Sequence, residues 1–136
     1  MSIEWINPPA LGKPSGFSHA ARVSAGTTVY LAGQTALDPQ GNIVGKSVVE
    51  QFERAMGNLL IALRAAGGSP TDLVSLTIFI VDMDDYRAHS RAIGEVWRRL
   101  IGDHYPTTAG IGVARLWDAA ALVEVQGVAV LADARN

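Results

Sequence analysis

Hydrophobic residues recur every three or four positions between Ser47 and Gly68, which is the period of one helix face. Ser47 and Glu50 have the spacing of a capping box, and Gly67, Gly68 and Pro70 end the pattern. The sequence therefore predicts a helix over 47–68. Its apolar side consists of Val48, Phe52, Met56, Leu59, Leu60 and Leu63.

The pattern changes to strict alternation over 73–81, which predicts a strand with one apolar and one more polar face. Aspartates at 82, 84 and 85 then favour the start of a second helix, which ends by Gly102 and Pro106. Further strands are predicted over 17–23, 28–32, 108–114 and 122–131, with Gly33 interrupting the second of these. The first fifteen residues, rich in proline and glycine, are predicted to be an irregular lead-in.

The predicted order β-β-α-β-α-β-β describes an α+β protein whose two helices lie on one face of the sheet. We expect a single domain over 1–136. In the last strand Val123 and Val125 belong to the helix-facing side, so Glu124 and Gln126 point to the other side. Two helices cannot cover both faces, so the second face is expected to meet other subunits.

Composition narrows the possible functions. The chain is 49% hydrophobic and 18% charged with a formal net charge of -2, so it lacks the basic field that nucleic-acid binding requires. It contains no cysteine, which excludes disulfides and thiolate chemistry. Its start lacks the pattern of a signal peptide, and no apolar run approaches the ~20 residues that span a bilayer. These features predict a cytoplasmic protein without a nucleic-acid or membrane partner.

Candidate chemistry centres on the carboxylate of Glu124. It is either an ordinary strand carboxylate, or a group in a partly buried cleft that takes a proton from water and returns it to a leaving group. His19, His89 and His104 lack the spacing of metal ligands, so no metal site is expected. Neither a nucleophile elbow nor a phosphate-binding glycine loop is present.

Several segments together resemble the Rid (reactive intermediate deaminase) family, also called RidA/YjgF and formerly endoribonuclease L-PSP. The resemblance extends from about Pro14 to Leu131. It rests on the order and spacing of PSGFSHAARV, VYLAGQTALDPQGNIVG, LTIFIVDMDDY, YPTTAGIGVARL and LVEVQGVAV.

The resemblance implies a chorismate-mutase-like subunit, assembled as a homotrimer around a central barrel of sheets with clefts between neighbours. In the family's deaminases these clefts hydrolyse enamines and imines to 2-keto acids and ammonia, without a metal or organic cofactor. An arginine holds the substrate carboxylate, a tyrosine lines the pocket, backbone at an S-G-Q turn helps hold the ligand, and a strand glutamate positions water.

Those roles match this chain unevenly. Glu124 matches the water-activating glutamate, and Ala32-Gly33-Gln34 matches the S-G-Q turn without its hydroxyl. Thr108 stands where the family has the arginine, and Phe17 stands where it has the tyrosine. Losing a charge-assisted pair of ~1.5 to 3 kcal/mol would weaken the binding of a small 2-imino acid.

Arg115 matches a different family arginine, and its odd offset from Thr108 places it on the opposite sheet face. Thr107, Thr108 and His19 could instead form a pocket of different polarity. Three functions therefore remain as hypotheses: an enamine/imine deaminase with a non-archetypal pocket, a non-catalytic trimer that binds a small carbonyl or carboxylate metabolite, and, with less support, a ribonuclease or translation inhibitor.

Overall fold

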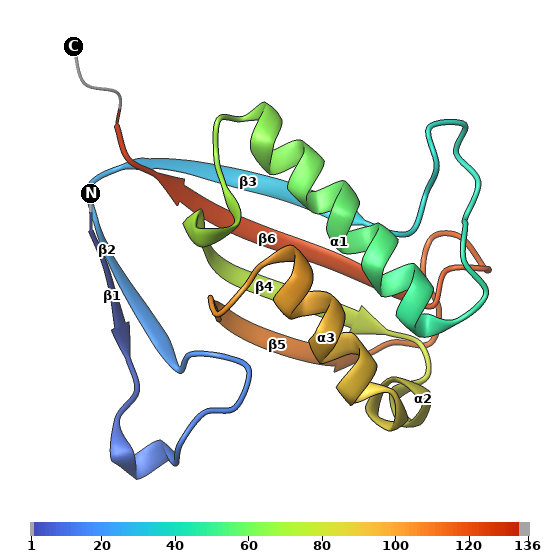
Figure 1. Cartoon of the computed structure of the whole chain (residues 1–136), viewed down its shortest axis with the longest axis horizontal. Helices are drawn as coiled ribbons and strands as arrows, with labels where there is room; N and C mark the ends of the chain where they lie inside the picture. The colour runs from blue at the N-terminus through green and yellow to red at the C-terminus, as the bar shows by residue number, and fades with distance from the viewer. Residues whose placement is uncertain (1, 134–136) are drawn as a thin grey trace.

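The computed structural model describes residues 2–133, which form an α+β arrangement of strands and helices (Figure 1). Its elements, in chain order, are β1 (Ser2–Ile6), η1 (Pro9–Leu11), β2 (Ala20–Ser24), β3 (Thr27–Gln34), α1 (Val48–Ala65), η2 (Pro70–Asp72), β4 (Leu73–Ile80), α2 (Met83–Ala88), α3 (Ser90–Leu100), β5 (Thr107–Gly112) and β6 (Val123–Leu131).

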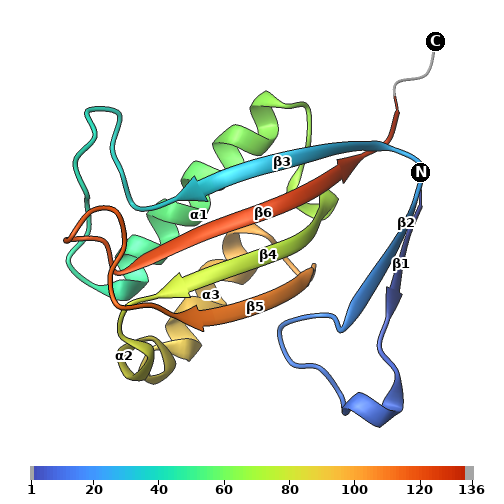
Figure 2. The ribbon, with the colours of Figure 1, turned by 180° about the vertical axis from the view of Figure 1, so that it is seen from behind.

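Strands β3, β6, β4 and β5 lie in that order in a mixed sheet, in which β4 and β5 are parallel and the other neighbours antiparallel. Helices α1 and α3 cover one face of this sheet, and the view from behind shows the other face without a covering helix (Figures 1 and 2). The predicted placement of the helices on one face is therefore confirmed.

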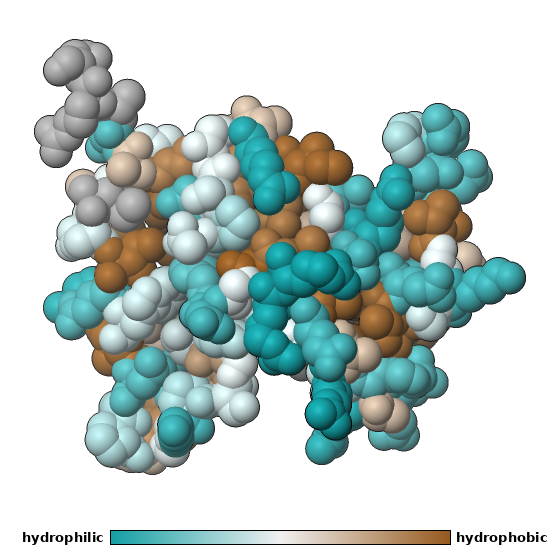
Figure 3. All heavy atoms as spheres, viewed as in Figure 1, coloured by the Kyte–Doolittle hydropathy of each residue, from teal (hydrophilic) through white to brown (hydrophobic). Residues whose placement is uncertain are grey.

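Helix α1 forms for the reasons that its sequence suggests. The Ser47 hydroxyl accepts from the Glu50 N–H at 3.1 Å, and the Glu50 carboxylate accepts from the Ser47 N–H at 3.2 Å, so the predicted capping box is present. The apolar side of the helix is buried against β3 and β6. Seen from the helix side, hydrophilic residues occupy much of the outer surface, with apolar patches between them (Figure 3).

One polar side chain of α1 is also buried. Gln51 is 2% exposed, and its amide nitrogen donates to the carbonyls of Gly45 and Ala120, each at 3.1 Å. Its amide oxygen accepts from the Leu122 N–H at 2.8 Å. These three bonds fix the segments before α1 and before β6 to the helix, because a buried amide without partners is costly.

The prediction of an irregular lead-in over 1–15 is wrong for Ser2–Ile6. These residues pair with β2 in an antiparallel two-stranded sheet, from Ser2 opposite Ser24 to Ile6 opposite Ala20. The prolines and glycines that suggested irregular structure begin only after this strand. The Trp5 ring meets the edge of the His104 ring at a centroid distance of 5.3 Å, so a residue distant in sequence helps to place the strand.

The predicted second helix is divided into α2 and α3. At His89 the backbone has φ -107° and ψ 18°, and its N–H donates to the Asp85 and Tyr86 carbonyls. This conformation ends one helix and begins the next. The strand predicted over 17–23 also starts later, at Ala20, while Ser18 forms an isolated parallel bridge with Thr107.

Candidate functional site

Glu124 lies on β6 between two fully buried valines, Val123 and Val125. Those valines belong to the core beneath the helices, whereas Glu124 is half-buried and points to the opposite face. The alternation predicted for this strand is confirmed. The acid between two valines is therefore on the face that α1 and α3 leave open.

Gly33 lies directly beneath the Glu124 carboxylate. A Cβ atom at Gly33 would overlap a carboxylate oxygen of Glu124 and would lie 2.9 Å from its Cδ and 3.3 Å from its Cγ. Any residue larger than glycine would displace this side chain. The structure thus brings together two of the predicted site residues.

The backbone around Gly33 departs from regular pairing. Leu31 is opposite Gly127 and Gln34 is opposite Val125, so β3 has one residue more than β6 in this interval. Ala32 and Gly33 occupy this bulge. Gly33 therefore interrupts the regular pairing, as predicted, but it does not end the strand, since β3 continues to Gln34. A bulge re-aims backbone polar groups that a regular ladder would pair, which is a common arrangement beside active sites.

A second group of predicted residues lies at the outer edge of the sheet, beside β5. Phe17, His19, Thr107 and Thr108 border a shallow depression of about 270 Å³. The Phe17 and His19 rings meet edge to face at 5.0 Å. The segment that carries Phe17 and His19 is held beside β5, because the Ser18 N–H donates at 3.2 Å to the carbonyl of Pro106, the residue before the strand.

Both threonine hydroxyls in this group have backbone partners. Thr107 Oγ1 donates to the Val74 carbonyl at 2.7 Å, and Thr108 Oγ1 donates to the Pro106 carbonyl at 2.9 Å. A hydroxyl that already donates its proton to a carbonyl cannot donate it to a ligand. Thr108 therefore does not supply the charged donors that an arginine at this position would offer a carboxylate.

These two groups do not form one cleft within a subunit. Glu124 lies in a cross-strand row with Phe79 and Ile111, and Thr108 precedes Ile111 by three residues. With strands ~4.8 Å apart and ~3.3 Å per residue, the Cα atoms of Glu124 and Thr108 are roughly 14 Å apart. Thr108 also pairs with the core residue Leu76, which faces the helices, opposite to Glu124.

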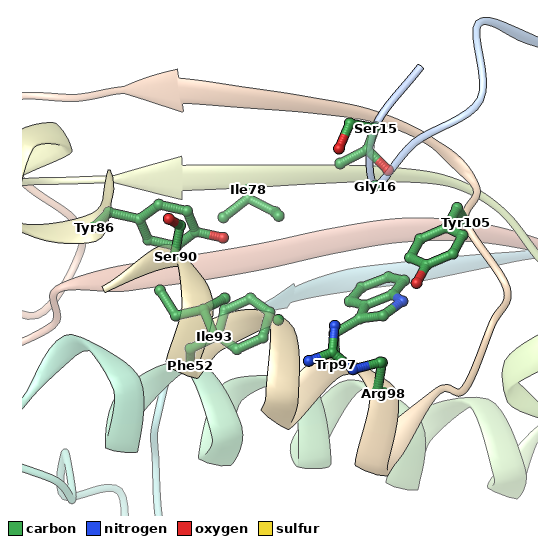
Figure 4. Close-up of a pocket in the computed structure, with 12 residues that line it drawn as sticks. Ser15, Gly16, Phe52, Ile78, Tyr86, Ser90, Ile93, Trp97, Arg98 and Tyr105 are labelled. Carbon is green, nitrogen blue, oxygen red and sulfur yellow. The ribbon is translucent and has the colours of Figure 1, made fainter. Parts of the chain in front are cut away.

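A larger pocket of about 430 Å³, which the sequence did not predict, lies on the helix side (Figure 4). Thr108 also lines this pocket. Its other principal walls come from α2, α3 and the chain before β5. The sequence gives no signal for this pocket, because aromatic side chains on a helix also pack in a core. The lining includes Phe52, Ile78, Tyr86, Ser90, Ile93, Trp97, Arg98 and Tyr105.

One residue of this pocket, Tyr86, has a pKa above its ordinary value. Burial raises the pKa of the Tyr86 phenol to about 12, because the charged phenolate loses its hydration. The phenol is therefore a neutral hydrogen-bond donor at physiological pH. Within residues 2–133, no group of three or more histidine, aspartate or glutamate side chains is arranged to hold a metal ion.

Arg115 reaches neither Glu124 nor the group around Thr108. Its guanidinium donates to the carbonyls of Leu116 and Trp117, at 3.1 and 3.2 Å, and so folds back on its own loop.

No helix among the described residues is long and apolar enough to cross a membrane.

Comparison with known proteins places these features in context. A family model described as endoribonuclease L-PSP matches residues 9–131. A RutC family protein of Pyrococcus abyssi is 32% identical over 131 residues, covering 95% of this chain and 98% of the relative. The 2-iminobutanoate/2-iminopropanoate deaminase of Capra hircus is also 32% identical, covering 90% of this chain and 83% of the relative.

A solved structure shares the fold over almost its full length. It is a Rid family protein of unknown function from Yersinia pestis, with a TM-score of 0.85 and 32% identity. The match covers 96% of this chain and all of that chain.

Proposed function

Because the chain belongs to the Rid (endoribonuclease L-PSP) family, we propose that it is a hydrolytic deaminase of enamines or imines that needs no cofactor. The observation that carries the proposal is the Glu124 carboxylate seated over the Gly33 bulge. A carboxylate beside backbone polar groups that have left the strand ladder can hold a water molecule against an electrophilic carbon. The similarity to a 2-iminobutanoate/2-iminopropanoate deaminase supports the same reaction class.

Glu124 acts as a general base and then as a general acid in this mechanism. An enamine first tautomerises to the imine, and water oxygen bonds to the imine carbon while Glu124 takes one water proton. Glu124 returns that proton to nitrogen, which gives a neutral carbinolamine. The hydroxyl proton then reaches nitrogen through Glu124, the C–N bond breaks, and a carbonyl compound and ammonia leave.

The complete site lies between subunits of a chorismate-mutase-like homotrimer. Glu124 and Thr108 face opposite sides of the sheet within one subunit, so a neighbour is needed to bring the two groups to one ligand. The open sheet face supports this assembly. Tyr30 on that face is 82% exposed, which is unusual for a large ring unless a partner covers it.

A non-catalytic metabolite-binding trimer is the alternative. It is favoured by Phe17, which has no hydroxyl to offer a substrate, and by Thr108, whose hydroxyl is bound to Pro106. The ligand in that case is a small carbonyl or carboxylate compound held in the same cleft.

The decay of enzymatically generated imines, followed with wild type, Glu124→Gln and the exposed-carboxylate control Glu95→Gln, distinguishes these functions. We expect wild type and Glu95→Gln to accelerate decay and Glu124→Gln to lose ~10² to 10⁴ of the rate. No acceleration across a panel of imines supports the binding protein instead. Acceleration that survives Glu124→Gln removes this residue from the mechanism, and a monomer in light scattering removes the intersubunit site.

A further inference from the structure

The helix-side pocket is built for a ligand with an apolar or aromatic body. Phe52, Ile93 and Trp97 are buried residues that line it, and the Trp97 and Tyr105 rings are stacked at 6.2 Å with an interplanar angle of 11°. Its volume of about 430 Å³ is in the range of small-molecule sites. A three-carbon acid would leave most of this space to water.

Arg98 is the cation that borders this pocket. It lies in the last turn of α3, and its side chain is drawn beside Trp97 at the pocket wall (Figure 4). Among residues 2–133, no ion pair or hydrogen bond engages its guanidinium, whereas the adjacent Arg99 is paired with Glu53 at 3.1 Å. Arg98 is thus free to bind an anion.

We infer that Arg98 determines specificity by holding the carboxylate of an aromatic or large apolar 2-imino acid whose side chain fills the helix-side pocket. This inference rests on the proposed deaminase function and names its substrate class. Thr108 lines the same pocket, so the guanidinium of Arg98 supplies from α3 the charge that the family's arginine supplies from β5. A guanidinium can bind a carboxylate through two parallel hydrogen bonds.

Two further polar side chains line the same pocket. Tyr86 and Ser90 have no hydrogen-bond partner for their hydroxyls within the described part of the chain, and both come from the α2–α3 segment. The Tyr86 phenol remains protonated up to high pH, because burial raises its pKa to about 12. Together with Arg98 these groups offer donors and no fixed negative charge, which suits an anionic ligand.

Calorimetric binding of two stable 2-keto acid products and one analogue tests the inference without requiring turnover. The probes are phenylpyruvate, pyruvate and phenylacetone, which has the aromatic body but no carboxylate. We expect wild type to bind phenylpyruvate at least tenfold more tightly than pyruvate. Arg98→Met should weaken the binding of phenylpyruvate at least tenfold and that of phenylacetone less than twofold. Arg98→Lys should recover part of the lost affinity. The control Arg91→Met, on the same helix outside the pocket, should change the affinity for neither compound.

Absence of phenylpyruvate binding, equal weakening of both aromatic probes, or the same loss in Arg91→Met would overturn the role of Arg98. Circular dichroism checks that the variants fold, which is expected because Arg98 is exposed. If carboxylate-dependent binding holds while no imine decays faster, the deaminase proposal fails and the Arg98 anion site stands. If imine decay depends on Glu124 but not on Arg98, the Arg98 inference fails and the deaminase proposal stands.

Discussion

Replacing Gly33 with alanine should displace the Glu124 carboxylate and lower activity, although Glu124 itself is unchanged. The new Cβ would overlap the carboxylate and lie 2.9 Å from Cδ, so the side chain of Glu124 must swing away. A displacement of about an ångström is expected to lower kcat/KM by ~10- to 100-fold. In free energy this is a loss of ~1.4 to 2.7 kcal/mol of transition-state stabilisation.

The same substitution should leave the free energy of unfolding almost unchanged. Gly33 does not have a positive φ, so alanine fits its backbone and restricts the unfolded chain, which stabilises by ~0.4 to 1 kcal/mol. The opposing cost is the movement of one half-buried, flexible side chain. Catalysis and stability therefore separate, which a general disruption of the sheet would not produce.

The assay is the imine decay rate, with urea unfolding measured in parallel. Gly112→Ala is the matched control, since a Cβ on this strand glycine would meet nothing closer than Met83 Cε at 3.8 Å. The double variant Gly33→Ala/Glu124→Gln should be no slower than Glu124→Gln alone, because both changes act on one carboxylate. Wild-type kcat/KM in Gly33→Ala, or losses that multiply in the double variant, would refute the reasoning.

Three predictions concern stability. Gln51→Leu removes the three hydrogen bonds of a buried side chain and should lower the free energy of unfolding, measured by urea titration, by ~2 to 3 kcal/mol. The control Gln40→Leu, at an exposed position, should change it little. Ser47→Ala removes the hydroxyl of the capping box and should cost ~1 kcal/mol; a change below the measurement error would mean that the cap is not used in solution. Tyr86 has a pKa of about 12 in the folded protein, above its ordinary value of 10.0. The contribution of its protonated phenol to the free energy of unfolding is therefore complete below pH 10 and is lost as pH rises toward 12. Tyr86→Phe should therefore flatten the alkaline fall in stability between those values, and an unchanged fall would assign it to other groups.

Local patterns in the sequence were sufficient for most elements. The three- and four-residue period and its capping box predicted α1, and strict alternation predicted β4 and the direction of Glu124 on β6. These features depend on contacts between near neighbours in the chain, which periodicity reports directly. The resemblance of several segments to the Rid family was likewise legible, because it rests on the order and spacing of those segments.

Long-range contacts decided most of the remaining features. Strand β1 depends on β2 and on the ring of His104, which lie far from it in the sequence. The break at His89 is local, but hydrophobic periodicity does not encode it. The sequence determined that Glu124 leaves the core, but only strand order and register showed that it sits over the Gly33 bulge and apart from Thr108. Arg98 and Thr108 lie ten positions apart on different elements, and it is the packing of α3 against the sheet that brings both to one pocket.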